Sequence, residues 1–216
     1  MYFTDLLRRQ FGSPSGAFGS NFIAPLMNVA NWRHIRASIR LLAPDPGDTV
    51  LDVGFGGGTS LLALSRRVIS GKIIGVDYSR DMVRDSAALI RRHGIESQVS
   101  VQWGDVAHLP LPDSSVDKIL SCNSLHYWAD IRLSLIELRR VLKPAGKLAL
   151  GFRSATCLRP FELVWRGFFV CEPQEMAALL RQAGFDIVHV EHRDWWRVPD
   201  MVVVVASKPI GQPSQP

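Results

Sequence analysis

Apolar residues along the chain follow two spacings, which alternate from residue 49 to residue 152. Short, nearly continuous apolar runs are typical of strands buried in a parallel sheet. Such runs cover residues 49–53, 72–77, 99–103, 118–122 and 147–152. Apolar residues at helical spacing predict helices over residues 59–68, 79–94 and 130–142. Strand and helix alternating in this way predict an α/β fold with a doubly wound sheet and right-handed crossovers.

The last third of the chain predicts a different arrangement. A helix over residues 173–183 has Pro173 in its first turn and Gly184 just past its end. Two apolar runs follow, at 185–191 and 201–207, with a short connection at 195–199. That connection is too short for a parallel crossover, so these two strands are expected to be antiparallel.

Composition changes at both ends of the chain. Residues 1–46 mix apolar and aromatic side chains with Gly, Ser and Pro, and they predict an N-terminal helical lid. Residues 47–208 are then expected to form a single catalytic domain. Residues 209–216 contain three prolines and no aromatic residue, and they predict a disordered tail.

Overall composition is that of an ordinary globular protein, with 47% apolar and 21% charged residues. No run reaches the roughly 18 apolar residues needed to span a bilayer, so stable membrane insertion is not expected. The start of the chain lacks a basic segment leading into an apolar one, and we expect no signal peptide. The three cysteines are odd in number and form no CxxC pair, which argues against disulfides and zinc and favours a cytoplasmic setting.

The net charge is +5, and the basic residues include scattered pairs of arginines, three of them near predicted helix ends. Solvated helix faces and favourable helix-end charges explain such pairs, so a nucleic-acid partner is not expected. The expected partner is a small molecule, and a homodimer is compatible with the sequence.

A glycine-rich turn follows the first predicted strand. Asp52, Gly54, Gly56 and Gly58 form the pattern D-x-G-x-G-x-G. Glycines let the backbone turn tightly and approach a ligand, and the N–H groups of the following helix favour an anionic group. A dinucleotide fingerprint would need a third glycine where Thr59 stands.

One acidic residue ends the second predicted strand, and another follows the third. Asp77 ends the second strand, where a carboxylate can accept hydrogen bonds from both hydroxyls of a ribose; the alternative is an acid that stabilises a helix start. Gly104, Asp105 and Val106 follow the third strand, and the sequence Leu-Lys-Pro-Ala-Gly at 142–146 precedes the fifth.

These ordered motifs together resemble the class I S-adenosylmethionine-dependent methyltransferases over about residues 45–152. The resemblance implies a seven-stranded Rossmann-like sheet with an antiparallel final strand. It also implies that Asp105 accepts from the adenine amino group and that the Val106 N–H reaches a ring nitrogen. The cofactor would be S-adenosyl-L-methionine, with no metal. The expected cofactor-binding residues are Asp52, Gly54, Phe55, Gly56, Gly58, Asp77, Tyr78, Met82, Gly104, Asp105, Val106, Asn123 and Ser124.

The methyl acceptor is expected between the lid and the ends of the fourth and fifth strands. Asn28, Asn31, Trp32, Tyr127 and Arg153 are the expected substrate residues, although the lid helix could instead merely cover the sheet. The apolar lid favours a small, hydrophobic acceptor. His126 is the candidate general base for a hydroxyl nucleophile; the alternative is a histidine that only packs or hydrogen-bonds its loop.

Four side chains of this set have a second interpretation. Tyr78 and Met82 either flank the adenine or belong to the packing, and Phe55 either narrows the methionine end of the pocket or faces the substrate. Arg153 either attracts an anionic substrate or is solvated.

We therefore predict methyl transfer to a small molecule, with oxygen favoured over nitrogen or carbon. One alternative is a cofactor-binding protein of the same fold that catalyses a cyclisation or rearrangement, or that only binds. A nicotinamide-dependent oxidoreductase is the other, and Thr59 and Asp105 argue against it.

Overall fold

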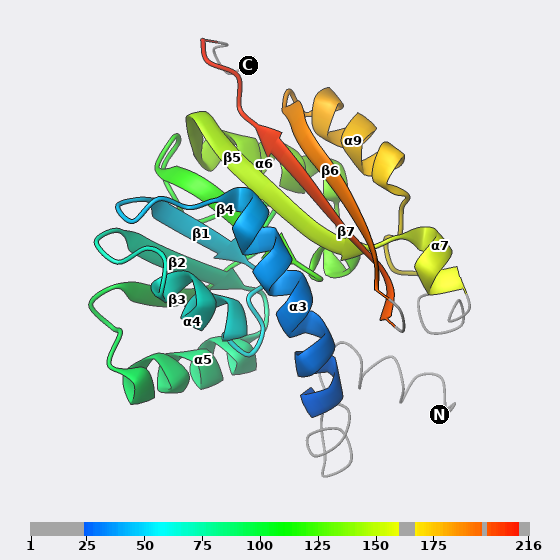
Figure 1. The fold of residues 1–216 in the computed structure, drawn as a ribbon. Coiled ribbons are helices and arrows are strands. Elements are labelled where there is room, and N and C mark those ends of the chain that lie inside the picture. Colours follow the sequence, from blue (N-terminus) through cyan, green and yellow to red (C-terminus); the bar gives the residue numbers. More distant parts are fainter. Residues whose placement is uncertain (1–23, 160–166, 196–197, 212–216) are drawn as a thin grey trace.

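A seven-stranded sheet forms the centre of the protein in the computed structural model, which describes residues 24–159, 167–195 and 198–211 (Figure 1). The strand order is β3-β2-β1-β4-β5-β7-β6. The strands are β1 (Thr49–Val53), β2 (Lys72–Asp77), β3 (Val99–Trp103), β4 (Val116–Cys122), β5 (Leu142–Arg153), β6 (Asp186–Trp195) and β7 (Val198–Ser207).

The five strands from β1 to β5 run parallel, and β7 runs against both β5 and β6. The predicted α/β sheet with an antiparallel final strand is therefore confirmed. The chain winds from β1 outward to β3 and then returns to β4 on the other side of β1. Ligands of such sheets bind outside the carboxyl ends of the strands at this reversal, here the ends of β1 and β4.

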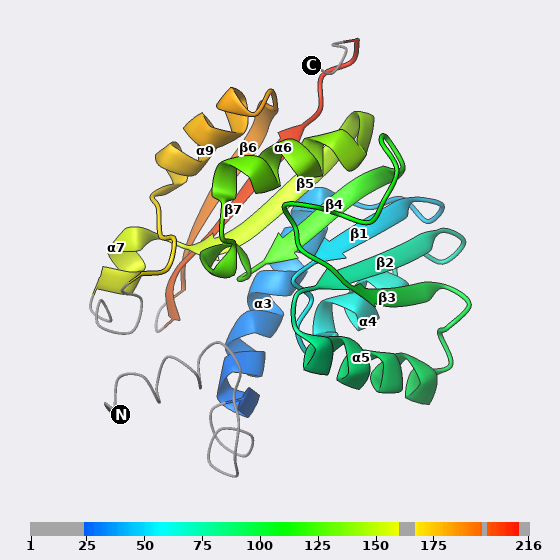
Figure 2. The same cartoon turned by 180° about the vertical axis from the view of Figure 1, so that it is seen from behind.

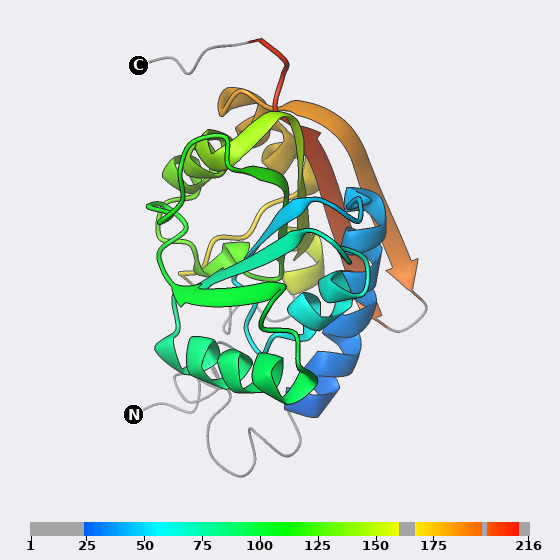
Figure 3. The same ribbon diagram turned by 90° about the vertical axis from the view of Figure 1, so that its left-hand side faces the viewer.

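Helices cover both faces of the sheet, as the views from behind and from the side show (Figures 2 and 3). One apolar core joins the sheet to α3, α4 and α5, and the other joins it to α6 and α9. The helices are α3 (Ala24–Leu42), α4 (Thr59–Ser65), α5 (Arg80–His93), α6 (Ile131–Val141), α7 (Ala155–Leu158) and α9 (Pro173–Gln182), with a 3₁₀ turn, η2, at Leu125–Tyr127.

The helix ends follow the sequence signals. The Ser79 hydroxyl accepts from the Met82 N–H at the start of α5, and the Asp130 carboxylate accepts from the Leu133 N–H at the start of α6. Gly94 ends α5 in the left-handed region, with φ of 65°. These caps position the loops that carry Asp77 and the residues after β4.

The segment from Leu142 to Gly146 departs from expectation. We expected the helix to end at residue 142 and the fifth strand to begin at residue 147, but residues 142–146 belong to the start of β5. Ala145 adopts a φ of 62°, and its N–H donates to the Lys208 carbonyl while the Lys208 N–H donates to Gly146. Hydrogen bonds with the chain just beyond β7 therefore extend the sheet through this irregular segment.

The helix α3 packs across β4, β5 and β7 (Figure 1). Gly151 in β5 permits this close approach, because a Cβ there would lie 2.5 Å from the Ser38 hydroxyl and 2.9 Å from His34 Nε2. The predicted lid is thus a helix over residues 24–42, and residues 1–23 lie outside the described residues. Most of the predicted tail, residues 212–216, also lies outside them.

Candidate cofactor and acceptor site

The glycine turn connects β1 to α4 with three left-handed residues. Gly54, Gly56 and Gly58 have φ of 71°, 54° and 80°. The Gly54 N–H donates to the Val76 carbonyl at 2.8 Å, which ties the turn to β2. A Cβ on Gly54 would lie 2.3 Å from the Cβ of Ser124, so glycine is also required by packing. The spacing D-x-G-x-G-x-G therefore serves a backbone that only glycine adopts at low cost.

The Asp77 carboxylate lies against this turn, at the carboxyl end of β2. Its Oδ2 accepts from the Gly56 N–H at 2.9 Å and its Oδ1 accepts from the Ser79 N–H at 2.8 Å. Burial raises the pKa of Asp77, and the two N–H donors act against that shift. Each carboxylate oxygen has a further lone pair, so Asp77 has the capacity to accept from two hydroxyls of a ribose.

Asp52 is a buried acid close to Asp77. Its side chain is within β1 and only 1% exposed, and its Oδ2 has no hydrogen-bond partner among the described residues. Burial raises the pKa of Asp52 to about 7; hydrogen bonding from Ser60 opposes the shift and the charge of Asp77 adds to it. An unpartnered carboxylate oxygen next to the glycine turn fits a cationic amino group, which would relieve the cost of burying this charge.

The Phe55 ring lies in the apolar core. It is 6% exposed and packs against Gly75, where a Cβ would come within 2.7 Å of the ring. This packing gives a reason for a large residue inside the glycine turn. The side-chain roles that we considered for Phe55, narrowing the pocket or facing the substrate, do not match this position, and only its backbone stays with the turn.

An exposed aromatic pair flanks the ends of β2 and β3. Tyr78 is 72% exposed, and its ring centroid lies 6.1 Å from that of Trp103. The Trp103 indole N–H donates to the Tyr78 carbonyl at 2.8 Å, and the Arg80 guanidinium lies 4.6 Å from the Trp103 ring centre. Met82 is partly buried against the core, which agrees with its packing alternative. We did not predict Trp103, because an aromatic residue ending a strand is an ordinary feature.

The loop after β3 is held by short-range contacts. The Gly104 N–H donates to the Asp77 carbonyl at 3.1 Å, so this loop lies beside the one that follows β2. Asp105 Oδ1 accepts from the Ala107 N–H at 2.9 Å, and the Val106 side chain is buried. The loop is thereby fixed close to Asp77, as a site for an adenine ring beyond the ribose requires.

The residues after β4 connect the glycine turn to α3. The Ser124 hydroxyl lies 2.6 Å from the Ser121 hydroxyl and donates to the Val53 carbonyl at 3.2 Å, so Ser124 joins the ends of β1 and β4. Asn123 has a φ of 56°, and its Nδ2 donates to Asn31 Oδ1 of α3 at 2.9 Å. Left-handed Asn residues often mark turns or functional sites.

His126 lies in η2 with its ring buried. Its Nδ1 is 2.7 Å from the Phe169 carbonyl oxygen, and the Phe169 N–H donates back to the His126 carbonyl. Burial lowers the pKa of His126, the Phe169 carbonyl acts in the opposite direction, and the charge of Arg153 lowers it further. The ring is therefore neutral at neutral pH, with its proton on Nδ1, because a carbonyl can only accept.

The remaining expected substrate residues have different surroundings. Tyr127 packs edge-on against Phe168, with ring centroids 5.3 Å apart. Trp32 lies on α3 with the Arg36 guanidinium 6.0 Å from its ring centre. Arg153 ends β5 and is partly exposed. The backbone of Asn28 belongs to α3, and its side chain is outside the described ones. Asn31, His126 and Arg153 thus come from three separate elements near the ends of β4 and β5.

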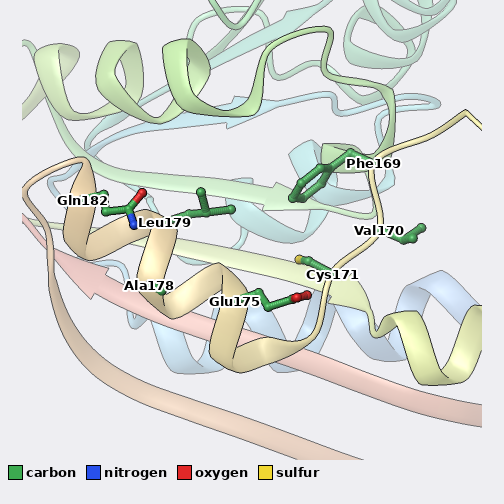
Figure 4. A pocket seen from close by; sticks show the side chains of 7 residues that line it. All are labelled: Phe169, Val170, Cys171, Glu175, Ala178, Leu179 and Gln182. Carbon is green, nitrogen blue, oxygen red and sulfur yellow. The ribbon is translucent and has the colours of Figure 1, made fainter.

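A hollow of about 350 Å³ lies between α9 and the chain that leads to it (Figure 4). Glu175 and Cys171 are among its lining residues. Glu175 accepts from the Glu172 N–H in the capping box of α9, and the Cys171 thiol is buried. Because this structural role and this burial account for both side chains, we assign no ligand to the hollow.

Residues 51–150 match a family described as a methyltransferase domain. The chain is 30% identical over 173 residues to the demethylmenaquinone methyltransferase of Lactobacillus johnsonii, covering 80% of this chain and 70% of that protein. It is 31% identical over 183 residues to the uncharacterized methyltransferase YdaC of Bacillus subtilis, covering 85% of this chain and 95% of the other. Some relatives are much longer: the chain spans 30% of an uncharacterized transposon protein from Streptomyces fradiae.

Solved structures share the fold. The crystal structure of a SAM-dependent methyltransferase from Aquifex aeolicus has a TM-score of 0.71 at 24% identity, covering 96% of this chain and 99% of that one. The crystal structure of the [4+2]-cyclase SpnF has a TM-score of 0.72 at 21% identity, covering 83% of this chain and 82% of that one.

Proposed function

The chain belongs to the class I S-adenosylmethionine-dependent methyltransferases, and on that premise we propose that it methylates a small, hydrophobic acceptor, preferably at oxygen. The observation that carries the proposal is the position of His126. This neutral, buried histidine follows β4, beside the strand that ends at the glycine turn. A hydroxyl nucleophile must lose a proton, and a neutral imidazole is suited to take it.

The residues of the cofactor half fit S-adenosyl-L-methionine. Asp77 would accept from the ribose hydroxyls, Asp105 and the Val106 N–H would hold the adenine, and Asp52 would accept from the amino group. The unpartnered Oδ2 of Asp52 supports the last assignment. When bound, the cofactor supplies a methyl group on a positively charged sulfur.

The chain itself contributes positioning and proton transfer. Holding an acceptor in line with a methyl group at close range supplies much of the rate of such a reaction. The helix α3 and η2 would bound the acceptor, and His126 would accept the proton at Nε2 because Nδ1 faces the Phe169 carbonyl. The aromatic side chains of Trp32 and Tyr127 on these elements support an apolar acceptor.

His126→Gln tests the proposed base. We expect turnover at saturating cofactor to fall 10²-fold or more, in the range typical of general bases, while affinity for S-adenosylhomocysteine stays within a few-fold of wild type. Retained cofactor affinity serves as the control for folding. An unchanged rate would remove the role of His126, and with it the main support for methylation at oxygen.

Labelled cofactor and a panel of acceptors test the reaction itself. The panel pairs phenols, amines and carbon nucleophiles of similar size, and transfer to a phenol is the expected result. Calorimetric titrations with S-adenosylmethionine and NADH accompany it, and only the first is expected to show tight binding. Tight NADH binding alone would overturn the proposal.

A second function is a non-methylating reaction on the same fold. The similarity to a [4+2]-cyclase shows that the fold alone does not fix the chemistry. Tight cofactor binding without methyl transfer to any acceptor would favour this alternative.

We also propose a small-molecule acceptor as the main partner, without nucleic acid, and a cytoplasmic setting. Cys122, Cys157 and Cys171 form no disulfide, which supports a reducing compartment. Among the described helices, none is long and apolar enough to cross a membrane.

A further inference from the structure

A buried polar contact lies between α3 and the ends of β4 and β5. Four buried side-chain atoms in the described part of the chain lack a hydrogen-bond partner, and three of them lie in this contact: His34 Nδ1, Ser38 Oγ and Asn123 Oδ1. Unpartnered buried polar atoms cost free energy, so natural proteins keep few of them. Their concentration beside the proposed acceptor position calls for a physical reason.

His34 is held as a hydrogen-bond acceptor. Its side chain is fully buried, and its Nε2 lies 3.0 Å from the Val202 carbonyl oxygen. A carbonyl only accepts, so Nε2 carries the proton. Burial lowers the pKa of His34 to about 4, against the opposing effect of the Val202 carbonyl, and the charge of Arg153 lowers it further. At neutral pH the ring is neutral, and Nδ1 presents a lone pair.

Asn123 lies between His34 and Asn31. Its backbone is fixed by the left-handed φ and by a hydrogen bond of 2.8 Å from its N–H to the Gly151 carbonyl. Its Nδ2 donates to Asn31 Oδ1, and its side chain also lies beside the His34 ring. In this orientation Asn123 Oδ1 and His34 Nδ1 are both acceptors without a donor.

A count of groups shows how this conflict is resolved. A neutral His34 and two carboxamides offer three acceptor atoms to the chain of contacts but only two NH₂ groups. A half-turn of both carboxamides exchanges oxygen and nitrogen at nearly unchanged positions. Asn123 Nδ2 then donates to His34 Nδ1, and Asn31 Nδ2 donates to Asn123 Oδ1. The acceptor without a donor is then the side-chain oxygen of Asn31 and no longer the buried His34 Nδ1. Asn31 is only partly buried.

We propose that Asn31, Asn123 and His34 form a directed hydrogen-bond chain that makes the Asn31 carbonyl oxygen the recognition point for a hydroxyl or N–H group on the methyl acceptor. Asn31 contacts the acceptor, whereas Asn123 and His34 are positioning residues. The selectivity rests on the proposed methyltransferase function, but the direction of the chain does not. An acceptor without such a donor leaves Asn31 Oδ1 unpaired and binds more weakly.

Nuclear magnetic resonance on ¹⁵N-labelled protein tests the direction of the chain without any acceptor. At neutral pH we expect His34 to be protonated at Nε2 alone, with scalar coupling across a hydrogen bond from the Asn123 NH₂ to Nδ1. Asn31→Asp should abolish this coupling, because a carboxylate cannot donate and draws the Asn123 NH₂ back toward itself. Asn31→Leu, which offers no acceptor, should keep it. Absence of the coupling in wild type, or its persistence in Asn31→Asp, overturns the direction.

The selectivity has its own test in the complex with S-adenosylhomocysteine. The probes are 2-naphthol and its methyl ether, 2-methoxynaphthalene, which differ by one hydrogen-bond donor. We expect only 2-naphthol to shift the Asn31 side-chain signals, and to bind about fivefold more tightly than the ether in wild type and Arg40→Gln but not in Asn31→Leu. Arg40 is an exposed residue of the same helix and serves as the control. Equal effects of both probes, or none from either, overturn the selectivity. Failure of S-adenosylhomocysteine to bind, with the wild-type coupling intact, would refute the proposed function instead.

Discussion

Asp52→Asn should remove part of the pH dependence of the free energy of unfolding. Burial raises the pKa of Asp52 from 3.8 to about 7, which corresponds to about 4 kcal/mol of preference for the protonated form in the folded state. The carboxyl therefore contributes most to stability below pH 4, and this contribution is lost as pH rises toward 7 and above. Asn mimics the protonated acid and does not ionise. Stability of the variant relative to wild type should thus increase by roughly 2 to 3 kcal/mol between pH 5 and pH 8.

Urea unfolding of both proteins without cofactor, at one-unit steps from pH 5 to pH 8, measures this difference. Asp85→Asn, which makes the same substitution at an exposed position, serves as the control. The same buried charge is expected to hold the cofactor amino group, so Asp52→Asn should also bind S-adenosylmethionine about tenfold or more weakly at pH 8.

Parallel stability profiles for wild type and Asp52→Asn would refute the argument, because they would mean that Asp52 does not titrate between pH 5 and pH 8. A parallel profile with weakened cofactor binding would keep Asp52 in the site but refute its raised pKa. Binding of the cofactor to wild type near pH 6 should also release protons, which calorimetry in buffers of different ionisation enthalpy detects.

Two further predictions concern the turn and the loop that frame the site. Gly54→Ala should destabilise the fold by about 2 kcal/mol or more and weaken S-adenosylhomocysteine binding, because the new Cβ meets Ser124 and φ is 71°. Gly57→Ala is the matched control, since a Cβ there has nothing within 4 Å; equal losses in the two variants would contradict the packing argument. Arg140→Met should cost about 1 to 3 kcal/mol at pH 7, because Arg140 pairs with Glu137 and donates to the Leu111 carbonyl. Arg140 lowers the pKa of Glu137, so the loss of stability in Arg140→Met should shrink as pH falls below 4. Thermal unfolding at pH 3 and pH 7 measures this change, and an equal loss at both pH values would contradict the role of the ion pair.

Local sequence was sufficient for the frame of the cofactor site. Apolar runs and caps predicted β1 to β4, α5, α6 and α9 within a few residues, because burial of a strand on both faces and the needs of helix ends leave direct marks on neighbouring residues. The position of Asp77 against the glycine turn also followed from sequence, since the carboxyl ends of adjacent parallel strands meet at one edge.

Other features were decided between residues far apart in the chain. Phe55 was expected to be a pocket residue, but its ring packs into the core, where Gly75 leaves room for it. Residues 142–146 were expected to precede the fifth strand, but hydrogen bonds with Lys208 make them part of it. Sequence patterns do not predict such contacts. The spacing of apolar residues indicates which side chains are buried, but not which distant residues they contact.

The sequence by itself determined the frame of the proposed cofactor site: the glycine turn, the acids in β1, at the end of β2 and after β3, and the strands that carry them. Only the tertiary structure brought His34 to the Val202 carbonyl, 168 residues away, and Asn31 to Asn123. The cofactor site is built from consecutive strand ends, whose geometry follows from local chain direction. The proposed acceptor side lies where α3 crosses β5 and β7, and that contact depends on packing across the whole sheet.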